Sequence, residues 1–344
     1  FRNIYETFVD DKIAEQGGKK LLAESEQVSN SFLRGFVKFY RTYKVMKESG
    51  ASIFHINVST PYDVVSGVAA KLAGVETIIV HSHNSKPDDR KLRNMLGPFC
   101  KALMPMITNV YLACSEEAAE FMFPASVLKN KRYHIVKNGI DLKRFSYRPA
   151  LREEFRGRYD CGDRLILGNI GRLHPQKNQR FLLEIMQEVL KQRPDALLYL
   201  IGVGELDEEL KAYAGELGIK DSVVFFGPSD EIPGMLHMMD AFVMPSLYEG
   251  LPLTGVEAQA AGLPCFFSDT ITRELELTEN ALYLPLEKDA AYWAEQVLEY
   301  DYQKPRRDFD KEIREQGFDI RTTALRLKRL YRKADEKSKR VGKS

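Results

Sequence analysis

The sequence lacks net charge, long apolar segments and paired cysteines, and each of these absences excludes a class of protein. Its 50 lysines and arginines are matched by 49 acidic residues, so the net charge of +1 gives no overall attraction to nucleic acid. No apolar run of about eighteen residues occurs, which excludes a membrane-spanning helix. The four cysteines, Cys100, Cys114, Cys161 and Cys265, are far apart and lack the spacing of a zinc site. We therefore expect buried thiols and a cytoplasmic protein.

Motifs for other nucleotide chemistries are also missing. Gly202-Val-Gly204 begins like a dinucleotide loop, but Asp207 stands where the third glycine belongs, so hydride transfer is not expected. No phosphate loop of the lysine-serine type occurs, which leaves a kinase or ATPase without support. The pair Asp308-Phe-Asp310 lies in a late charged segment away from the predicted strand ends. We therefore expect no metal ion and no cofactor.

What the sequence does contain is typical of α/β proteins. With 344 residues, of which 44% are hydrophobic, the chain can bury two cores. Apolar runs alternate with helical patterns, which predicts parallel sheets built from βαβ units. A turn signal at residues 138–141 and a polar stretch through residues 148–150 predict a linker. We expect one domain over residues 1–145, a second over residues 146–310, and C-terminal helices over residues 311–344. The strands are predicted at residues 53–58, 75–80, 110–114 and 134–137, then at 165–171, 196–202, 223–227, 241–245, 264–267 and 281–285.

Two motifs at predicted strand ends favour a nucleotide-sugar as ligand. Arg172 and Lys177 stand in Gly171-Arg-Leu-His-Pro-Gln-Lys-Asn178, and Glu249 and Glu257 follow a later strand. The fixed cations suit the concentrated negative charge of a pyrophosphate, and a carboxylate can accept bonds from paired ribose hydroxyls. A solvated basic loop would also explain the cations, so it is the combination that favours a nucleotide-sugar site.

A helix predicted to begin near Thr254 completes this candidate site. Backbone amides of Leu253, Thr254 and Gly255 would form an anion site, which the helix dipole strengthens. We place Glu257 in the first turn of the same helix. An acidic residue is favourable there without any ligand, so Glu257 alone does not indicate a binding site.

These motifs resemble family 4 of the retaining glycosyltransferases with the GT-B fold. Residues 171–178, 249–257, 138–141 and 258–264 carry the likeness, which runs from about Ile53 to about Gln296 and is closest to enzymes of bacterial capsular or exopolysaccharide synthesis. The resemblance implies two Rossmann-like α/β/α domains with parallel sheets facing a central cleft. The first domain would bind the acceptor and the second the nucleotide-sugar.

The resemblance also assigns roles to single residues. Glu249 would contact the sugar or its transition state, and Glu257 would hold the ribose. A histidine after the strand at residues 75–80 would approach the transferred sugar; His83 is the first choice and His81 the second, because alternation points both the same way. Arg172 and Lys177 would stabilise the departing diphosphate, which makes the enzyme independent of metal.

Family members open with a strand, a glycine-rich loop and a helix. The sequence printed here begins at Phe1, so we expect that the opening strand and loop are missing from it. The resemblance also suggests that the C-terminal helices return to the first domain.

The resulting hypothesis is a retaining hexosyltransferase that uses a nucleotide-sugar, with UDP as the expected nucleotide, and a saccharide or lipid-linked acceptor. Residues 32–47 mix aromatic and basic side chains at helical spacing, which would suit peripheral contact with the inner face of the cell membrane or, equally, a core helix with a basic outer face. Two alternatives stay open: a nucleotide-sugar epimerase or hydrolase on the same scaffold, and a non-catalytic nucleotide-sugar-binding subunit.

Overall fold

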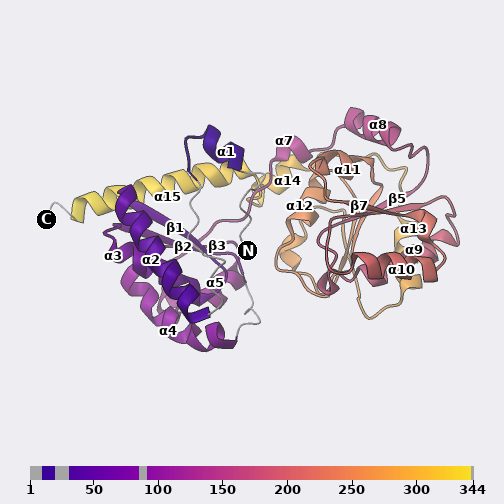
Figure 1. The fold of residues 1–344 in the computed structure, drawn as a ribbon. Helices are drawn as coiled ribbons and strands as arrows, with labels where there is room; N and C mark the ends of the chain where they lie inside the picture. Colours follow the sequence, from indigo (N-terminus) through magenta and orange to yellow (C-terminus); the bar gives the residue numbers. More distant parts are fainter. Residues whose placement is uncertain (1–9, 20–30, 85–90, 342–344) are drawn as a thin grey trace. The chain divides into compact units, whose positions relative to one another are not determined.

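The computed structural model describes residues 10–19, 31–84 and 91–341, and the opening residues 1–9 lie outside them. The chain divides into two compact units, each described here by itself (Figure 1). Unit 1 combines Phe1–Lys137 with Leu325–Ser344, and unit 2 is Asn138–Ala324.

The boundary lies earlier in the chain than the predicted one after residue 145. The reason is the pairing of the turn at residues 138–141 with the segment before the last helix. Ile140 N donates to Phe318 O at 2.7 Å, and Ile320 N donates to Ile140 O at 2.9 Å. Gly139 is needed there because a Cβ would stand 2.6 Å from Ile320 N. These bonds make the turn part of unit 2.

Unit 1 is built on a parallel sheet with the strand order β1-β2-β3-β4. Its strands are β1 (Ile53–Val58), β2 (Thr77–Ser82), β3 (Val110–Ala113) and β4 (His134–Ile135). Its helical elements are α1 (Asp10–Glu15), α2 (Ser31–Ser49), η1 (Pro61–Val64), α3 (Val65–Leu72), α4 (Lys91–Ile107), α5 (Glu116–Met122) and α6 (Ala125–Lys129). The last helix of the chain, α15 (Ile320–Val341), supplies its residues from Leu325 onwards to this unit.

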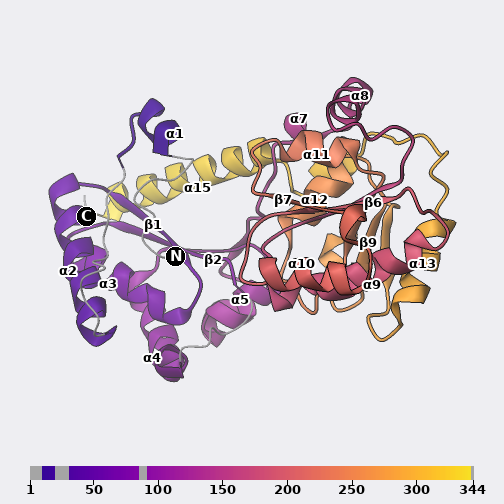
Figure 2. The same ribbon diagram turned by 45° about the vertical axis from the view of Figure 1, so that its right-hand side comes forward.

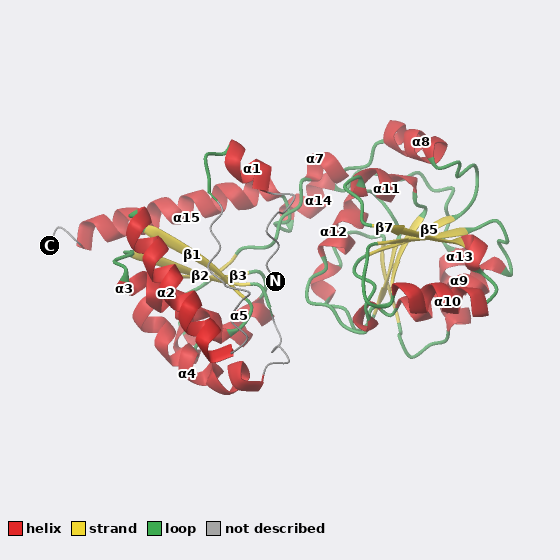
Figure 3. Cartoon of the chain, viewed as in Figure 1, coloured by secondary structure: helices red, strands yellow, loops and turns green. Residues whose placement is uncertain are grey.

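Alternation along β2 sends side chains to two different layers of unit 1. Ile78 and Val80 pack in the core formed with α3, α4 and α5, whereas Ile79 packs with Leu330 and Tyr331 of α15. Helices therefore lie on both sides of this sheet (Figure 3).

Unit 2 is built on a parallel sheet with the strand order β10-β9-β8-β5-β6-β7. The strands are β5 (Ile166–Ile170), β6 (Leu197–Ile201), β7 (Val223–Gly227), β8 (Ala241–Met244), β9 (Cys265–Ser268) and β10 (Ala281–Leu284). The chain moves outward from β5 through β6 to β7, then returns to β8 on the other side of β5. The sheet is thus doubly wound, with its topological switch point between β5 and β8, where such sheets bind ligands.

Helices cover both faces of this second sheet. One layer contains α9 (Gln179–Leu190), α10 (Asp207–Glu216) and α13 (Ala290–Glu299). The other contains α7 (Leu142–Phe145), α8 (Pro149–Arg158), α11 (Ile232–Met238), α12 (Leu253–Ala260) and α14 (Asp310–Glu315). Short 3-10 turns are η2 (Pro175–Lys177), η3 (Lys220–Ser222) and η4 (Arg273–Leu275). The rotated view keeps these two layers on opposite sides of the strands (Figure 2).

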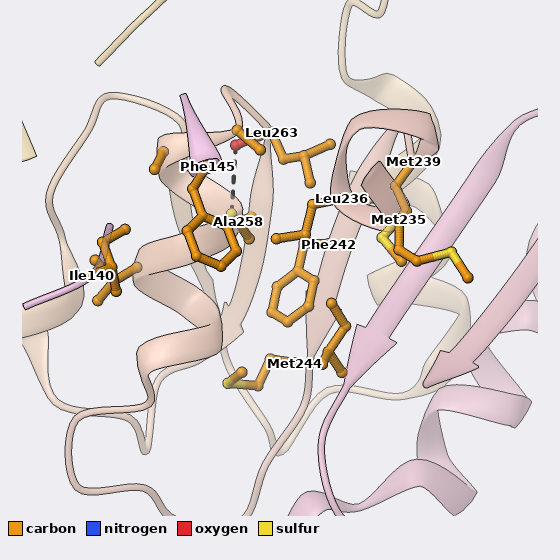
Figure 4. Packing of buried hydrophobic residues seen from close by; sticks show 14 of the residues in the cluster. Ile140, Phe145, Met235, Leu236, Met239, Phe242, Met244, Ala258 and Leu263 are labelled. Atoms are coloured by element: carbon orange, nitrogen blue, oxygen red, sulfur yellow. Dashed lines mark hydrogen bonds between the residues drawn. The ribbon is translucent and has the colours of Figure 1, made fainter. Parts of the chain in front are cut away.

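The core between the sheet and α11 and α12 shows why these elements form. Figure 4 shows Phe145 of α7 and Leu236 of α11 around Phe242 of β8, all of them buried. The turn after α12 is closed by Leu263 N, which donates to Ala258 O at 3.2 Å. Apolar burial of this kind supplies the main stabilisation of each layer.

The α/β fold class predicted from the sequence is confirmed, and each predicted strand is present with small shifts at its ends. All four cysteines are buried and unpaired, as expected. Among the described residues, no helix has both the length and the apolar character needed to span a bilayer.

Candidate active site

The switch point of unit 2 brings two of the predicted site residues together. Lys177 follows β5 and Glu249 follows β8, the two strands that pair at that point. Lys177 Nζ lies 2.6 Å from Glu249 Oε1, and the side chains are only 18% and 9% exposed. A charge-assisted bond at this length and burial fixes both groups in one geometry.

A tight turn places Lys177 at the sheet edge. His174 precedes η2 and its Nδ1 accepts from Gln176 N at 3.2 Å. Asn178 follows in the left-handed region, with φ of 54°, and its amide Nδ2 donates to Pro245 O at 3.1 Å. Gly171 leaves room for the lysine, because a Cβ there would lie 3.3 Å from Lys177 Cε. The left-handed backbone at Asn178 and the absence of a side chain at Gly171 therefore both help to position Lys177.

The loop that carries Glu249 is held from two sides. Gln176 Nε2 donates to Tyr248 O at 2.9 Å, and Leu247 N donates to Gln176 O at 2.9 Å. On the other side, Ser246 O accepts from Ser268 Oγ at 2.6 Å and from Thr270 Oγ1 at 2.9 Å. The carboxylate is thus held in place by its loop as well as by Lys177.

Arg172 lies at the same edge but is exposed. Its carbonyl oxygen accepts from Gln179 Nε2 at 3.0 Å, which ties the backbone of the β5–η2 connection to the start of α9. The guanidinium group therefore extends from a fixed backbone, as an anion-binding side chain requires.

The first turn of α12 begins at Leu253, one residue before the predicted start at Thr254. Amides in a first helical turn lack intrahelical acceptors, so those of Leu253 and Thr254 suit an anion. Gly255 N donates to Pro252 O at 3.1 Å, and a Cβ on Gly255 would stand 2.9 Å from Leu275 Cδ2. Gly255 therefore has a structural role in closing and packing this turn.

The prediction that Glu257 lies in the first turn of its helix is wrong. The first turn of α12 contains no acidic residue, because the helix starts four residues before Glu257. The favourable interaction with the amino end of the helix therefore does not explain its presence. Burial raises the pKa of Glu257 to about 7, against a smaller opposing effect of Arg144. A half-buried carboxyl group with this pKa is typical of functional sites.

Three histidines of unit 1 form a cluster: His55 lies in β1, His81 lies in β2, and His83 follows β2. His81 is buried, and its ring lies 4.2 Å from that of His83 and 5.3 Å from that of His55. His83 is partly exposed, and its Nε2 lies 2.8 Å from Asn57 Oδ1. His55 Nδ1 lies 2.5 Å from the hydroxyl of Tyr331 on α15, which supports a structural role for His55. Burial, with smaller effects of His83 and His55, lowers the pKa of His81 to about 3, so this ring is neutral at physiological pH.

The sequence did not indicate Gln176 as a site residue, although its side chain bonds to Tyr248 O in the Glu249 loop. Gln176 stands inside the motif of residues 171–178, but a 3-10 turn directs consecutive side chains in different directions, so its position beside Lys177 does not predict its contact. The contact with Tyr248 spans 72 positions of the chain, so no local pattern reveals it.

The geometry of unit 2 supports binding of a phosphate-bearing ligand with hydroxyl groups. Arg172 and Lys177 follow β5, and Glu249, the start of α12 and Glu257 follow β8; of these groups, the structure shows Lys177 and Glu249 in direct contact. A diphosphate could be held by the cations and amides, and sugar hydroxyls by the carboxylates.

Comparisons with known proteins agree with this chemistry. The family profile described as glycosyl transferases group 1 matches residues 152–316. The putative glycosyltransferase EpsF of Bacillus subtilis (strain 168) is 34% identical over 336 residues, which cover 95% of this chain and 86% of EpsF. A galactosyltransferase of Escherichia coli, named UDP-Gal:alpha-D-GlcNAc-diphosphoundecaprenol alpha-1,3-galactosyltransferase, is 28% identical over 70% of this chain and 63% of its own length.

Solved structures agree at the level of the fold. Anabaena HepE in complex with UDP-glucose superposes with a TM-score of 0.72 at 19% identity, over 94% of this chain and 88% of HepE. The sucrose-phosphate synthase of Thermosynechococcus elongatus gives a TM-score of 0.67 at 19% identity, over 92% and 82% of the two chains. The two-domain arrangement of parallel sheets expected from the sequence, the GT-B fold, is thereby confirmed.

Proposed function

The chain belongs to the glycosyl transferases group 1 family, and from this premise we propose that it is a retaining, metal-independent hexosyltransferase of family 4. As a glycosyltransferase it moves a sugar from a nucleotide-sugar to an acceptor. The donor we propose is a UDP-hexose. The E. coli relative is named for UDP-Gal, and the structural neighbour HepE binds UDP-glucose, which supports this choice.

The observation that carries the proposal is the pairing of Lys177 with Glu249 at the switch point. In the free protein Lys177 Nζ is held by Glu249 at 2.6 Å. A donor diphosphate would offer Lys177 a second anion, and Arg172 would approach the same phosphates from the exposed side. The two fixed cations then neutralise the charge that develops on the leaving nucleoside diphosphate. The amides of Leu253 and Thr254 add donors that need no reorganisation.

In the reaction, the bond between the anomeric carbon and the phosphate oxygen breaks through an oxocarbenium-like state. The acceptor hydroxyl attacks the same face, its proton passes to an oxygen of the leaving phosphate, and a new glycosidic bond forms with retained configuration. Glu249 contacts the transferred sugar and Glu257 accepts bonds from the ribose hydroxyls. To His83 we assign the histidine role at the transferred sugar that the family resemblance implies.

The acceptor we propose is a saccharide carried by a lipid, used in capsular or exopolysaccharide synthesis. The E. coli relative is named for a diphosphoundecaprenol acceptor, and the exposed side chains of α2 suit a lipid surface. Leu33, Phe36 and Tyr40 are 52%, 63% and 57% exposed on one side of α2, and Lys44 and Lys47 follow them. We therefore place the enzyme peripherally at the inner face of the cell membrane.

Calorimetric titration with UDP, GDP and ADP, in the presence of a chelator, tests the donor site directly. We expect micromolar binding of UDP to the wild-type protein and at least tenfold weaker binding to Arg172→Ala. Lys191→Ala is the control, because Lys191 is an exposed lysine at the opposite end of α9. Binding that requires a divalent ion, or that Arg172→Ala leaves unchanged, would contradict the proposed diphosphate site.

A further inference from the structure

A cavity of about 200 Å³ lies in unit 2 at the opposite edge of its sheet from Lys177 and Glu249. Its lining includes Asp240, Pro264 and Asn280, which stand directly before β8, β9 and β10. These are the amino ends of parallel strands, whereas the candidate active site follows their carboxyl ends. The cavity therefore takes no part in the mechanism proposed above.

Arg152, Arg306 and Asp240 line the inner wall of this cavity, and Arg156 pairs with Asp240 behind that wall, so an excess of positive charge lies there. Asp240 Oδ1 lies 2.5 Å from Arg152 Nη2 and 3.9 Å from Arg306 Nη2, and Asp240 Oδ2 lies 3.1 Å from Arg156 Nη1. The four side chains are between 11% and 24% exposed. Three guanidinium groups thus share a single carboxylate in a poorly solvated place.

Backbone carbonyl groups satisfy many of these donors without balancing their charge. Arg156 Nη1 donates to Met238 O at 3.0 Å, and Arg306 Nη1 donates to His237 O at 3.3 Å. A carbonyl oxygen carries only a partial charge, so two positive charges of the cluster lack a counter-charge. Burial, and then the neighbouring Arg152, lower the pKa of Arg306 to about 10, as expected where positive charges crowd together.

The rim of the cavity adds two more cations and a competing acid. Arg307 Nη1 lies 3.5 Å and Lys304 Nζ 4.0 Å from Glu279 Oε1, and all three side chains are more than half exposed. The side-chain amides of Asn280 and Gln303 also line the cavity. Arg307 Nη2 also pairs with Glu312, which lies outside the lining, so Arg307 is already partly engaged. The pairs to Glu279 are loose and exposed, so an anion can take the place of Glu279 at small cost.

We propose that this cavity is a second, anion-binding site for a phosphate or carboxylate group carried on a molecule the size of a monosaccharide. The anion supplies the counter-charge that the arginine cluster lacks and bonds to Lys304 and Arg307. The volume exceeds that of a phosphate alone, and the amides of Asn280 and Gln303 and the ring of Tyr147 suit the hydroxyls and faces of a sugar.

The test is calorimetric titration of the full chain at low ionic strength with glucose 1-phosphate, inorganic phosphate, glucuronate and glucose. We expect glucose 1-phosphate or glucuronate to bind, and glucose not to bind. In Lys304→Ala/Arg307→Ala, binding should weaken about tenfold or more, since two charge-assisted contacts are lost. In Glu279→Gln it should strengthen severalfold, because the competing acid is removed. Equal binding of inorganic phosphate would identify a free phosphate as the ligand.

Two controls separate this site from the donor site and from general charge effects. Arg172→Ala should leave the affinity unchanged, whereas binding that is lost only in Arg172→Ala would show that the ligand occupies the donor site and would overturn the proposal. Lys288→Ala, which removes an exposed lysine outside the cavity, should also have no effect. The proposal is equally overturned if none of the anions binds at about 10 mM, if glucose binds as well as they do, or if Glu279→Gln weakens binding.

Discussion

Lys177 Nζ and Glu249 Oε1 lie 2.6 Å apart at the point where the strand order of unit 2 reverses. The residues come from different strand ends, separated by 72 positions, and both side chains are largely buried. The pair therefore fixes the position of the cation that, in the proposed mechanism, meets the donor phosphate.

We predict that Lys177→Ala lowers transfer by about 10³-fold while the fold is kept. The variant removes the cation that we propose stabilises the leaving diphosphate, and it leaves Glu249 buried without its lysine partner. Unfolding in urea should show a loss of roughly 1 to 3 kcal/mol. Turnover is measured with the donor that binds in the calorimetric experiment, and unchanged turnover would remove the assigned role of Lys177.

A double variant separates catalysis from stability. In Lys177→Met/Glu249→Gln no buried charge is left unpaired, so the free energy of unfolding should return to within about 1 kcal/mol of the wild-type value. Transfer should stay as low as in Lys177→Ala. Recovery of activity together with stability would mean that the pair acts only on the fold.

Glu257→Gln is predicted to change how stability depends on pH. Burial raises the pKa of Glu257 from 4.5 to about 7, so between these values the folded protein binds more protons than the unfolded chain. Stability therefore falls as pH rises through this window, by at most about 1.4 kcal/mol per pH unit, and levels off above about 7. Glu257→Gln should lack this contribution. Equal slopes for both proteins in urea unfolding at pH 5 to 8 would contradict the raised pKa.

The same carboxyl group gives donor affinity a pH dependence. In the proposed mechanism the ionised form accepts bonds from the ribose hydroxyls, so UDP should bind more tightly as pH rises from about 6 to about 8. Calorimetry on Glu257→Gln should show weaker binding with a flatter pH profile. The matching variant Glu279→Gln, which changes an exposed acid outside the donor site, should keep the wild-type profile. A steep profile in Glu257→Gln would assign the titration to another group.

The strands could be predicted because buried parallel strands are continuous apolar runs with turn residues at their ends. Lys177 and Glu249 could be assigned to one site because both motifs follow strand ends. The ion pair between them could not be predicted, because it depends on which strands are neighbours in the sheet. The sheet order that pairs β5 with β8 is a property of the whole unit.

Other features depend on contacts between distant segments and left no local pattern. The sequence predicts that residues 138–141 belong to the first domain. Their backbone hydrogen bonds to residues 318–320 instead make them part of unit 2. The predicted start of α12 is one residue late, which puts Glu257 in the first turn, because nothing in the sequence distinguishes Leu253 from Thr254 as the first helical residue. Asp240 gathers three arginines from two segments more than 60 positions away, and its own neighbourhood in the sequence is apolar.

His83→Ala is predicted to lower transfer about 10²-fold while leaving the affinity for UDP unchanged. The residue belongs to unit 1 and approaches the transferred sugar in the proposed mechanism, whereas the diphosphate contacts come from unit 2. His134→Ala is the control, because His134 is an exposed histidine on the edge strand β4. Equal kcat values for His83→Ala and the wild type would move the role to His81 or to no histidine.

The exposed side of α2 leads to the last prediction, which concerns the membrane. Phe36 and Tyr40 are more than half exposed, one helical turn apart, beside the lysines of the same helix. Apolar and basic groups together bind anionic bilayers better than either alone, so Phe36→Ser/Tyr40→Ser should sediment at least fivefold less with phosphatidylglycerol vesicles (roughly 1 kcal/mol). Leu72→Ser removes an apolar group of similar exposure from α3 and should sediment like the wild type. If both variants behave alike, or if neutral vesicles retain the protein equally well, α2 is not the surface that meets the membrane.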